Sequence, residues 1–152
     1  MLSRYDSSSK VEVHALASGS SGNATLITSG GVSILIDAGL GIRKLTSVLN
    51  NRGIAAGALS AIFVTHEHID HISGLHSLAA RWQASVIANK ATLEACAERE
   101  EAEYGAIELP TGGSYCVGDL QVTSFPIPHD AVEPVGYVVS SPTARIASQG
   151  TR

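Results

Sequence analysis

The sequence predicts a mixed α/β fold, of the α+β kind, in which helices cover one face of a mixed sheet. Three observations support this prediction. The 152-residue chain is 44 % hydrophobic and only 16 % charged, which is typical of a globular protein with a buried core. Short apolar runs typical of strands are interspersed with segments of helical spacing. Some expected strands follow one another directly, as in hairpins, and others are separated by helices.

The first part of the chain contains an expected strand, a hairpin and a helix. Residues 1–10 are polar and serine-rich, so we expect a flexible N-terminus before a single domain over residues 11–152. A weakly alternating run and two apolar runs around Ser29-Gly30-Gly31 predict strands, and a stretch rich in Ser, Gly and Asn predicts a turn. The expected elements are strands over 11–17, 24–28 and 32–36, a turn over 18–23, and a helix over 42–49 that stops at 50–53.

The second part alternates strands and helices and then continues as strands. The apolar run from Ala61 to Thr65 predicts a short buried strand, and Leu75, Leu78 and Ala79 mark the apolar face of a helix. Asn89 is an expected N-cap. The expected elements are a strand over 61–65, helices over 73–82 and from 89 to about 103, and strands over 85–88, 114–117, 120–125 and 135–139, with a hairpin turn at 118–119.

Composition and charge exclude several classes of protein. A net charge of −4 argues against broad, non-specific nucleic-acid binding, which needs clustered Lys and Arg. No stretch approaches the ~20 apolar residues of a membrane span, and the first ten residues lack the apolar segment of a secretory signal. Cys96 and Cys116 lack zinc-ribbon or redox spacing, and Cys96 is expected to be a reduced cysteine on a helix face. These features predict a cytoplasmic protein without a membrane partner.

The segment His66-Glu67-His68-Ile69-Asp70-His71 follows the expected strand over 61–65 and predicts a metal site. Imidazole and carboxylate are ligands that suit zinc, iron and manganese. His66 and His68 are two residues apart and could converge on one ion, whereas the adjacent Asp70 and His71 diverge and would serve a second. A helix-borne zinc site would instead place its histidines four residues apart. The spacing therefore favours a loop-borne, two-metal site over a solvated loop that binds nothing.

A third ligand for the first ion has to come from elsewhere in the chain, because one metal needs at least three protein ligands. His129 follows an expected strand and lies beside prolines, which lower the entropic cost of placing a ligand. It is the expected partner of His66 and His68, against the alternative of a surface histidine. His14 in a strand and His76 on a helix are expected to be structural.

The pattern His66-x-His68-x-Asp70-His71 resembles the signature of the metallo-β-lactamase superfamily. Three further segments resemble its YycJ/WalJ-type branch, and the resemblance covers roughly residues 11 to 147. These segments are Leu16–Asn23, Leu35–Gly39, and Pro128–Ala131 with Pro134–Tyr137. The resemblance implies an αβ/βα sandwich with the metals at one edge. It also implies a soluble bacterial hydrolase, and some members of the branch are exonucleases that act on DNA.

The resemblance also implies roles for individual residues. His66, His68 and His129 would bind one metal, and Asp70 and His71 the second, with Asp70 also orienting the water nucleophile as a catalytic residue. Zinc is the expected ion, with manganese or iron as alternatives. Asp37 resembles a buried aspartate that braces the metal loop, or it forms a turn. Ser18–Asn23 could present backbone N–H groups to an anion, or it is a plain hairpin turn.

The resemblance also predicts two ligands that this chain lacks. The family adds a bridging aspartate and a last histidine farther along, but no aspartate follows Asp130 and no histidine follows His129. We therefore expect a chain shortened before the second half of the sandwich, with an uncovered sheet face and an exposed apolar patch. Three functions compete: a phosphodiester hydrolase acting on DNA, an inactive remnant that binds metal, and a non-catalytic interaction fragment that forms a homo-oligomer through the exposed sheet.

Overall fold

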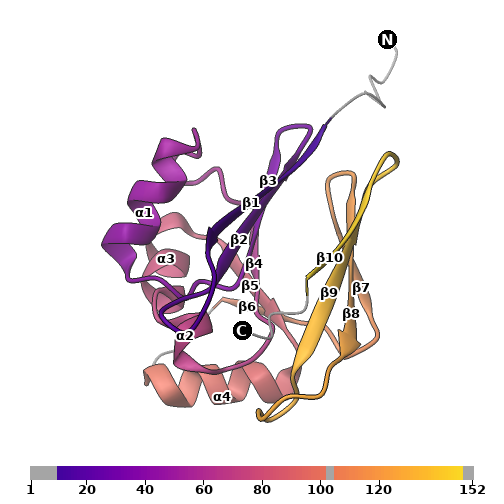
Figure 1. The fold of residues 1–152 in the computed structure, drawn as a ribbon. Coiled ribbons are helices and arrows are strands. Elements are labelled where there is room, and N and C mark those ends of the chain that lie inside the picture. Colours follow the sequence, from indigo (N-terminus) through magenta and orange to yellow (C-terminus); the bar gives the residue numbers. More distant parts are fainter. Residues whose placement is uncertain (1–9, 102–104, 149–152) are drawn as a thin grey trace.

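Two sheets pack face to face, and helices cover the far face of the larger one (Figure 1). The computed structural model describes residues 10–101 and 105–148. The larger sheet contains β1 (Val11–Ala17), β2 (Ala24–Ser29), β3 (Val32–Ile36), β4 (Ala61–Phe63), β5 (Ser85–Ala88) and β6 (Ala106–Glu108) in that order. The smaller sheet has the order β10 (Arg145–Ser148), β9 (Val135–Ser140), β8 (Leu120–Pro126) and β7 (Ser114–Val117). The helices are α1 (Ile42–Asn51), α2 (Ile69–Ile72), α3 (Leu75–Trp82) and α4 (Lys90–Glu100).

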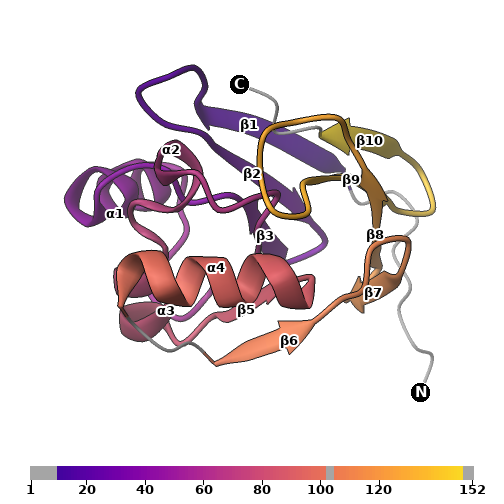
Figure 2. The same ribbon diagram turned by 90° about the horizontal axis from the view of Figure 1, so that it is seen from below.

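Strand pairing confirms the mixed sheet. Strands β1, β2 and β3 are antiparallel neighbours, as expected of a hairpin, whereas β3, β4, β5 and β6 pair in parallel. Parallel strands need crossover connections, and the helices supply them. Figure 2 shows the same layers from below, with the helices on one side and β7, β8 and β9 on the other. None of the described helices is long and apolar enough to cross a membrane.

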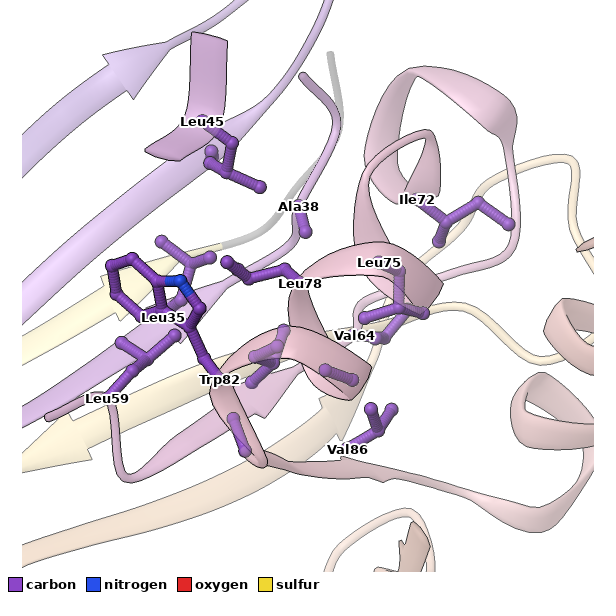
Figure 3. Close-up of a cluster of buried hydrophobic side chains, with 14 of the residues drawn as sticks. Leu35, Ala38, Leu45, Leu59, Val64, Ile72, Leu75, Leu78, Trp82 and Val86 are labelled. Atoms are coloured by element: carbon purple, nitrogen blue, oxygen red, sulfur yellow. The ribbon is translucent and has the colours of Figure 1, made fainter. Parts of the chain in front are cut away.

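The central strands β3, β4 and β5 of the larger sheet are buried on both faces, which accounts for their nearly continuous apolar sequences. On β3, Leu35 belongs to the core beneath the helices, whereas Ile34 and Ile36 belong to the core between the sheets. Figure 3 shows the first core, where Leu45, Leu75, Leu78 and Trp82 gather from α1 and α3. In the second core the rings of Phe63 and Tyr137 meet edge to face at 5.5 Å.

The outer face of the smaller sheet is not covered by any described element. Its outward side chains include Cys116, Gln121 and Arg145, which are exposed. The large apolar side chains that are exposed, rather than half-buried, among the described residues are Val13, Ile69 and Val132. None of these three belongs to the smaller sheet. Pairing of two chains through this face stays a prediction.

Several expected boundaries shift in the structure. The strand expected over 61–65 ends at Phe63, and the helix expected over 73–82 begins at Leu75 after the separate single turn α2. The Asn89 cap is confirmed, because its Oδ1 accepts from the backbone N–H of Thr92 at 2.8 Å. The helix that it caps ends at Glu100. The expected continuation is wrong at Glu101, which is the left-handed C-cap, and residues 102–103 lie outside the described residues. So do residues 1–9 of the expected flexible segment 1–10.

Candidate metal centre

His66 and His68 lie just beyond the carboxyl end of β4, an edge where loops carry functional side chains. His66 is fully buried and His68 is half-buried. The backbone N–H of Val64 donates to the carbonyl of Ile87 at 3.0 Å, which continues the pairing with β5 up to the start of this segment. The sheet therefore holds the origin of the histidine segment in place.

The structure brings His129 to His66 and His68, with one ligand nitrogen from each lying within 4.8 Å of the others. The ring centroids of His66 and His129 are 4.5 Å apart, and those of His68 and His129 are 5.1 Å apart. His66 Nε2 is buried without a hydrogen-bond partner among the described residues. A buried nitrogen of this kind usually has a partner, so its isolation beside two other imidazoles fits a metal ligand.

Hydrogen bonds from three directions position the loop that carries His129. The backbone N–H of Val132 donates to the buried carboxylate of Glu67 at 3.0 Å. Asn89 donates its side-chain amide to the carbonyl of Glu133, also at 3.0 Å. The N–H of Val135 donates to the carbonyl of Thr65 at 3.0 Å. These contacts attach the loop between β8 and β9 to the segment that carries the other two histidines.

Asp37 lies beneath the cluster and accepts three hydrogen bonds, which agrees with the bracing role implied by the resemblance. Its Oδ1 accepts from the Thr65 N–H at 2.8 Å, and its Oδ2 accepts from the Thr65 hydroxyl at 2.7 Å and from His71 Nδ1 at 2.6 Å. The Thr65 hydroxyl oxygen, whose proton is used on Asp37, accepts from His66 Nδ1 at 3.0 Å. Protons on both Nδ1 atoms leave both Nε2 atoms free to act as ligands.

Asp70 and His71 lie together on the single turn α2, so the expectation of a wholly loop-borne site is wrong for this pair. Asp70 Oδ2 and His71 Nε2 are 3.6 Å apart, close enough for both to contact one ion. His71 is buried, whereas the Asp70 side chain is 25 % exposed. The rings of His66 and His71 are 4.1 Å apart, so the pair adjoins the three-histidine cluster.

Burial determines the charge of the central groups. Burial, together with a smaller contribution from the nearby imidazoles of His71, His129 and His68, lowers the pKa of the His66 imidazole to about 3. His66 is therefore neutral at ordinary pH, which is the form that binds metal. Burial also raises the pKa of the Asp37 carboxyl above its usual value, opposed by the hydrogen bonds and charge of His71 and the hydrogen bonds of Thr65.

Two histidines and the serine-rich turn have other environments. His14 accepts at its Nδ1 from Arg52, 2.9 Å away, and its Nε2 is 3.2 Å from Glu12. His76 is exposed on α3 and is not part of the three-histidine cluster. In the turn over 18–23, the N–H of Asn23 donates to the carbonyl of Asp70 at 2.8 Å. Sequence reasoning missed this contact and the anchoring role of Glu67, because both join residues distant in the chain.

Comparison with known proteins identifies the family. Residues 33–149 match the model of the β-lactamase superfamily domain. The chain is 37 % identical over 129 residues to the exodeoxyribonuclease WalJ of Streptococcus pneumoniae, covering 80 % of this chain and 47 % of the relative. It is 34 % identical over 140 residues to the exodeoxyribonuclease YycJ of Bacillus anthracis, covering 87 % and 51 %. The chain thus spans about half the length of these curated relatives.

Solved structures share the fold. A metallo-β-lactamase from Cronobacter sakazakii superimposes with a TM-score of 0.74 at 20 % identity, over 82 % of this chain and 56 % of that one. The metallo-β-lactamase fold protein YhfI from Bacillus subtilis superimposes with a TM-score of 0.72 at 19 % identity, over 89 % and 59 %. Together with the family match, these similarities show that the chain belongs to the metallo-β-lactamase superfamily, in the branch of WalJ and YycJ.

Proposed function

We propose that this chain carries the metal centre of a metal-dependent hydrolase that cleaves phosphodiester bonds, with DNA as the substrate of an exonuclease-like reaction. The observation that carries the proposal is the cluster of His66, His68 and His129, with ligand nitrogens within 4.8 Å and a buried, unpartnered nitrogen on His66. The relatives named as exodeoxyribonucleases support nucleic acid as the substrate class.

In this proposal the cluster forms a first site and α2 a second. Three imidazoles would hold the first ion and leave an open position for water. Asp70 and His71 would hold a second ion. Neutral imidazole and carboxylate suit zinc, with manganese and iron as alternatives. A bound divalent ion supplies an activated water, with a pKa lowered to about 7, and stabilises charge that develops on the phosphoryl group.

The protein residues do the positioning. Asp37 holds His71 directly, and holds His66 through Thr65, with the ligand nitrogens pointing away from the brace. Asp70 is the partly exposed carboxylate beside them, and we assign it the role of orienting the nucleophilic water and accepting its proton. His129 is exposed and His68 half-buried, so the side of the cluster that they form is the side open to substrate.

A second candidate is a chain that holds one ion and does not turn over substrate. The observation that favours it is the unequal number of ligands, since the first site has three imidazoles whereas the second pair has one carboxylate and one imidazole. It predicts one tightly held ion. A non-catalytic fragment that pairs through the smaller sheet is the third candidate, and it predicts a dimer that survives a chelator.

Metal analysis of the purified protein, beside a phosphodiesterase assay on a chromogenic diester and on linear DNA, separates these candidates. Two ions with hydrolysis support the first, one ion without hydrolysis the second, and no ion with a chelator-resistant dimer the third. His68→Ala should remove most of the bound metal, whereas the matched control His76→Ala on α3 should retain it. Equal metal content in both variants would refute the ligand assignment.

We place the protein in a reducing compartment such as the bacterial cytoplasm. Neither cysteine forms a disulfide within the described residues; Cys96 is buried and Cys116 is exposed. An exposed free thiol is typical of proteins that do not encounter oxidising conditions. Alkylation of the protein in freshly opened cells would label Cys116 if this placement holds.

A further inference from the structure

The turn over residues 18–23 packs directly against the α2 turn that carries Asp70 and His71. The backbone N–H of Asn23 donates to the carbonyl of Asp70, and that of Gly39 donates to the carbonyl of Asn23, both at 2.8 Å. A methyl group on Gly39 would lie 1.8 Å from the Asp70 carbonyl oxygen. Three segments far apart in the sequence therefore meet here at backbone contact, with no room for a side chain at Gly39.

The side chain of Asn23 uses all of its hydrogen-bonding groups in this contact. It is 8 % exposed. Its Oδ1 accepts from the Gly19 N–H at 3.2 Å, and its Nδ2 donates to the Gly19 carbonyl at 2.9 Å. The same Nδ2 lies 3.2 Å from Asp70 Oδ2 and 3.3 Å from the Asp70 carbonyl oxygen. The oxygen faces the Gly19 donor and the nitrogen faces only acceptors, which fixes the orientation of the amide.

We propose that Asn23 is a positioning residue that holds the Asp70 carboxylate beside His71 in the orientation needed to bind the second ion. The inference rests on the proposed function only in taking Asp70 and His71 as metal ligands. The turn alone requires only the two bonds to Gly19. The contact with Asp70 Oδ2 lies outside the turn and reaches the one oxygen that is 3.6 Å from His71 Nε2.

Two separate hydrogen bonds thus orient the two ligands of the second site. Asp37 fixes the imidazole of His71 through Nδ1, and Asn23 fixes the carboxylate of Asp70 through Oδ2. The Asp70 side chain is a quarter exposed, so without the amide it would be free to turn toward solvent. Partners that orient metal ligands from behind typically contribute about 10- to 100-fold to metal affinity.

The test measures metal affinity at the two sites separately, with Co²⁺ as the only ligand. Metal-free protein is titrated with Co²⁺, the visible absorbance gives successive dissociation constants, and elemental analysis gives the stoichiometry. The variants are Asn23→Ala, Asn23→Ser and the control Ser21→Ala, which alters an exposed side chain of the same turn. Thermal unfolding of each metal-free variant shows that it is folded. Asn23→Ser keeps a residue suited to turns in case the alanine variant is unstable.

We expect both Asn23 variants to raise the second dissociation constant at least tenfold, with the first constant and the Ser21→Ala protein unchanged. Equal weakening of both sites would indicate a general loss of structure, and that result would overturn the inference. So would unchanged affinity at the second site, or a wild-type chain that takes up only one ion. Uptake of two ions without phosphodiester cleavage would instead refute the proposed function and leave the role of Asn23 intact.

Discussion

Replacing Asp37 with asparagine should disable the metal centre while leaving the fold in place. The wild-type carboxylate accepts from three donors, namely the Thr65 N–H, the Thr65 hydroxyl and His71 Nδ1. An asparagine of the same size keeps one acceptor oxygen and places an NH₂ donor where Oδ2 stood. His71 must then accept at Nδ1 and carry its proton on Nε2. The Thr65 hydroxyl would then donate to His66 Nδ1, so His66 would also carry its own ring proton on Nε2.

The expected magnitude follows from these contacts. A ring nitrogen that carries a proton cannot bind a metal ion until the proton moves back to the other ring nitrogen. Outer partners of metal ligands typically account for about 10- to 100-fold in affinity, or roughly 1.4 to 2.8 kcal/mol. The stability of the metal-free fold should change less. Weakened hydrogen bonds cost about 1–3 kcal/mol, but removing a buried charge whose pKa burial has raised offsets part of that loss. Asparagine also tolerates the left-handed backbone of position 37, where φ is 65°.

The assay compares Zn²⁺ affinity, by competition with a chromophoric chelator, with urea unfolding of the metal-free protein. Asp119→Asn is the matched control, because Asp119 is a partly buried aspartate in the turn between β7 and β8. We expect weak zinc binding with near-normal unfolding for Asp37→Asn and wild-type behaviour for the control. If Asp37→Asn bound zinc as tightly as the wild type, the proposed proton arrangement would be wrong.

Three further perturbations test other parts of the structure. Glu67→Ala removes the acceptor of the Val132 N–H and so loosens the His129 loop. The first metal dissociation constant should rise about tenfold, and an unchanged constant would refute the anchoring role of Glu67. Gly39→Ala should destabilise the protein by about 1–3 kcal/mol in urea unfolding, because its methyl group meets the Asp70 carbonyl, and unchanged stability would mean that the three segments can separate. His66 takes up a proton near pH 6.5 in the unfolded chain but only near pH 3 in the folded one, because its pKa is lowered by folding. The metal-free protein should therefore lose stability as the pH falls from 6.5 to 3. The free energy of unfolding lost through His66 is at most about 5 kcal/mol, at about 1.4 kcal/mol per pKa unit. If stability fell with pH equally in the wild type and in His66→Gln, this prediction would be contradicted.

Much of the fold follows from local pattern, and the misses have physical causes. Strands such as β2 and β3 are apolar runs that flank a glycine turn, so their position and pairing are readable from sequence. The sequence does not predict the strand β6, because its three residues, Ala106 to Glu108, present no apolar run. Alternation within β7, β8 and β9 identifies strands but does not tell which sheet they join. The second sheet was therefore expected only through the family resemblance.

The candidate site also contains residues that the sequence predicts and residues that it does not. His66, His68, Asp70 and His71 lie within six residues, so their spacing alone indicated a metal site. His129 was expected from its prolines and the preceding strand, and the structure brings it to the cluster. Residues that act from behind the ligands carry weaker local signals. Asn23 has the appearance of any turn asparagine, and its contact with Asp70 spans 47 residues, a distance over which spacing gives no information.

The three-histidine cluster spans the boundary between the two layers of strands. His66 and His68 follow a strand of the larger sheet, whereas His129 follows a strand of the smaller one. An ion held by all three would act as a crosslink at the rim of the sandwich, in addition to the apolar side chains between the layers and the bond from the Tyr137 hydroxyl to the Val64 carbonyl. Loss of that ion would remove the crosslink and leave the rim held by the apolar core and by the hydrogen bonds of Glu67, Asn89 and Val135. A bound ion would thus add to the cohesion of the domain as well as supply its chemistry.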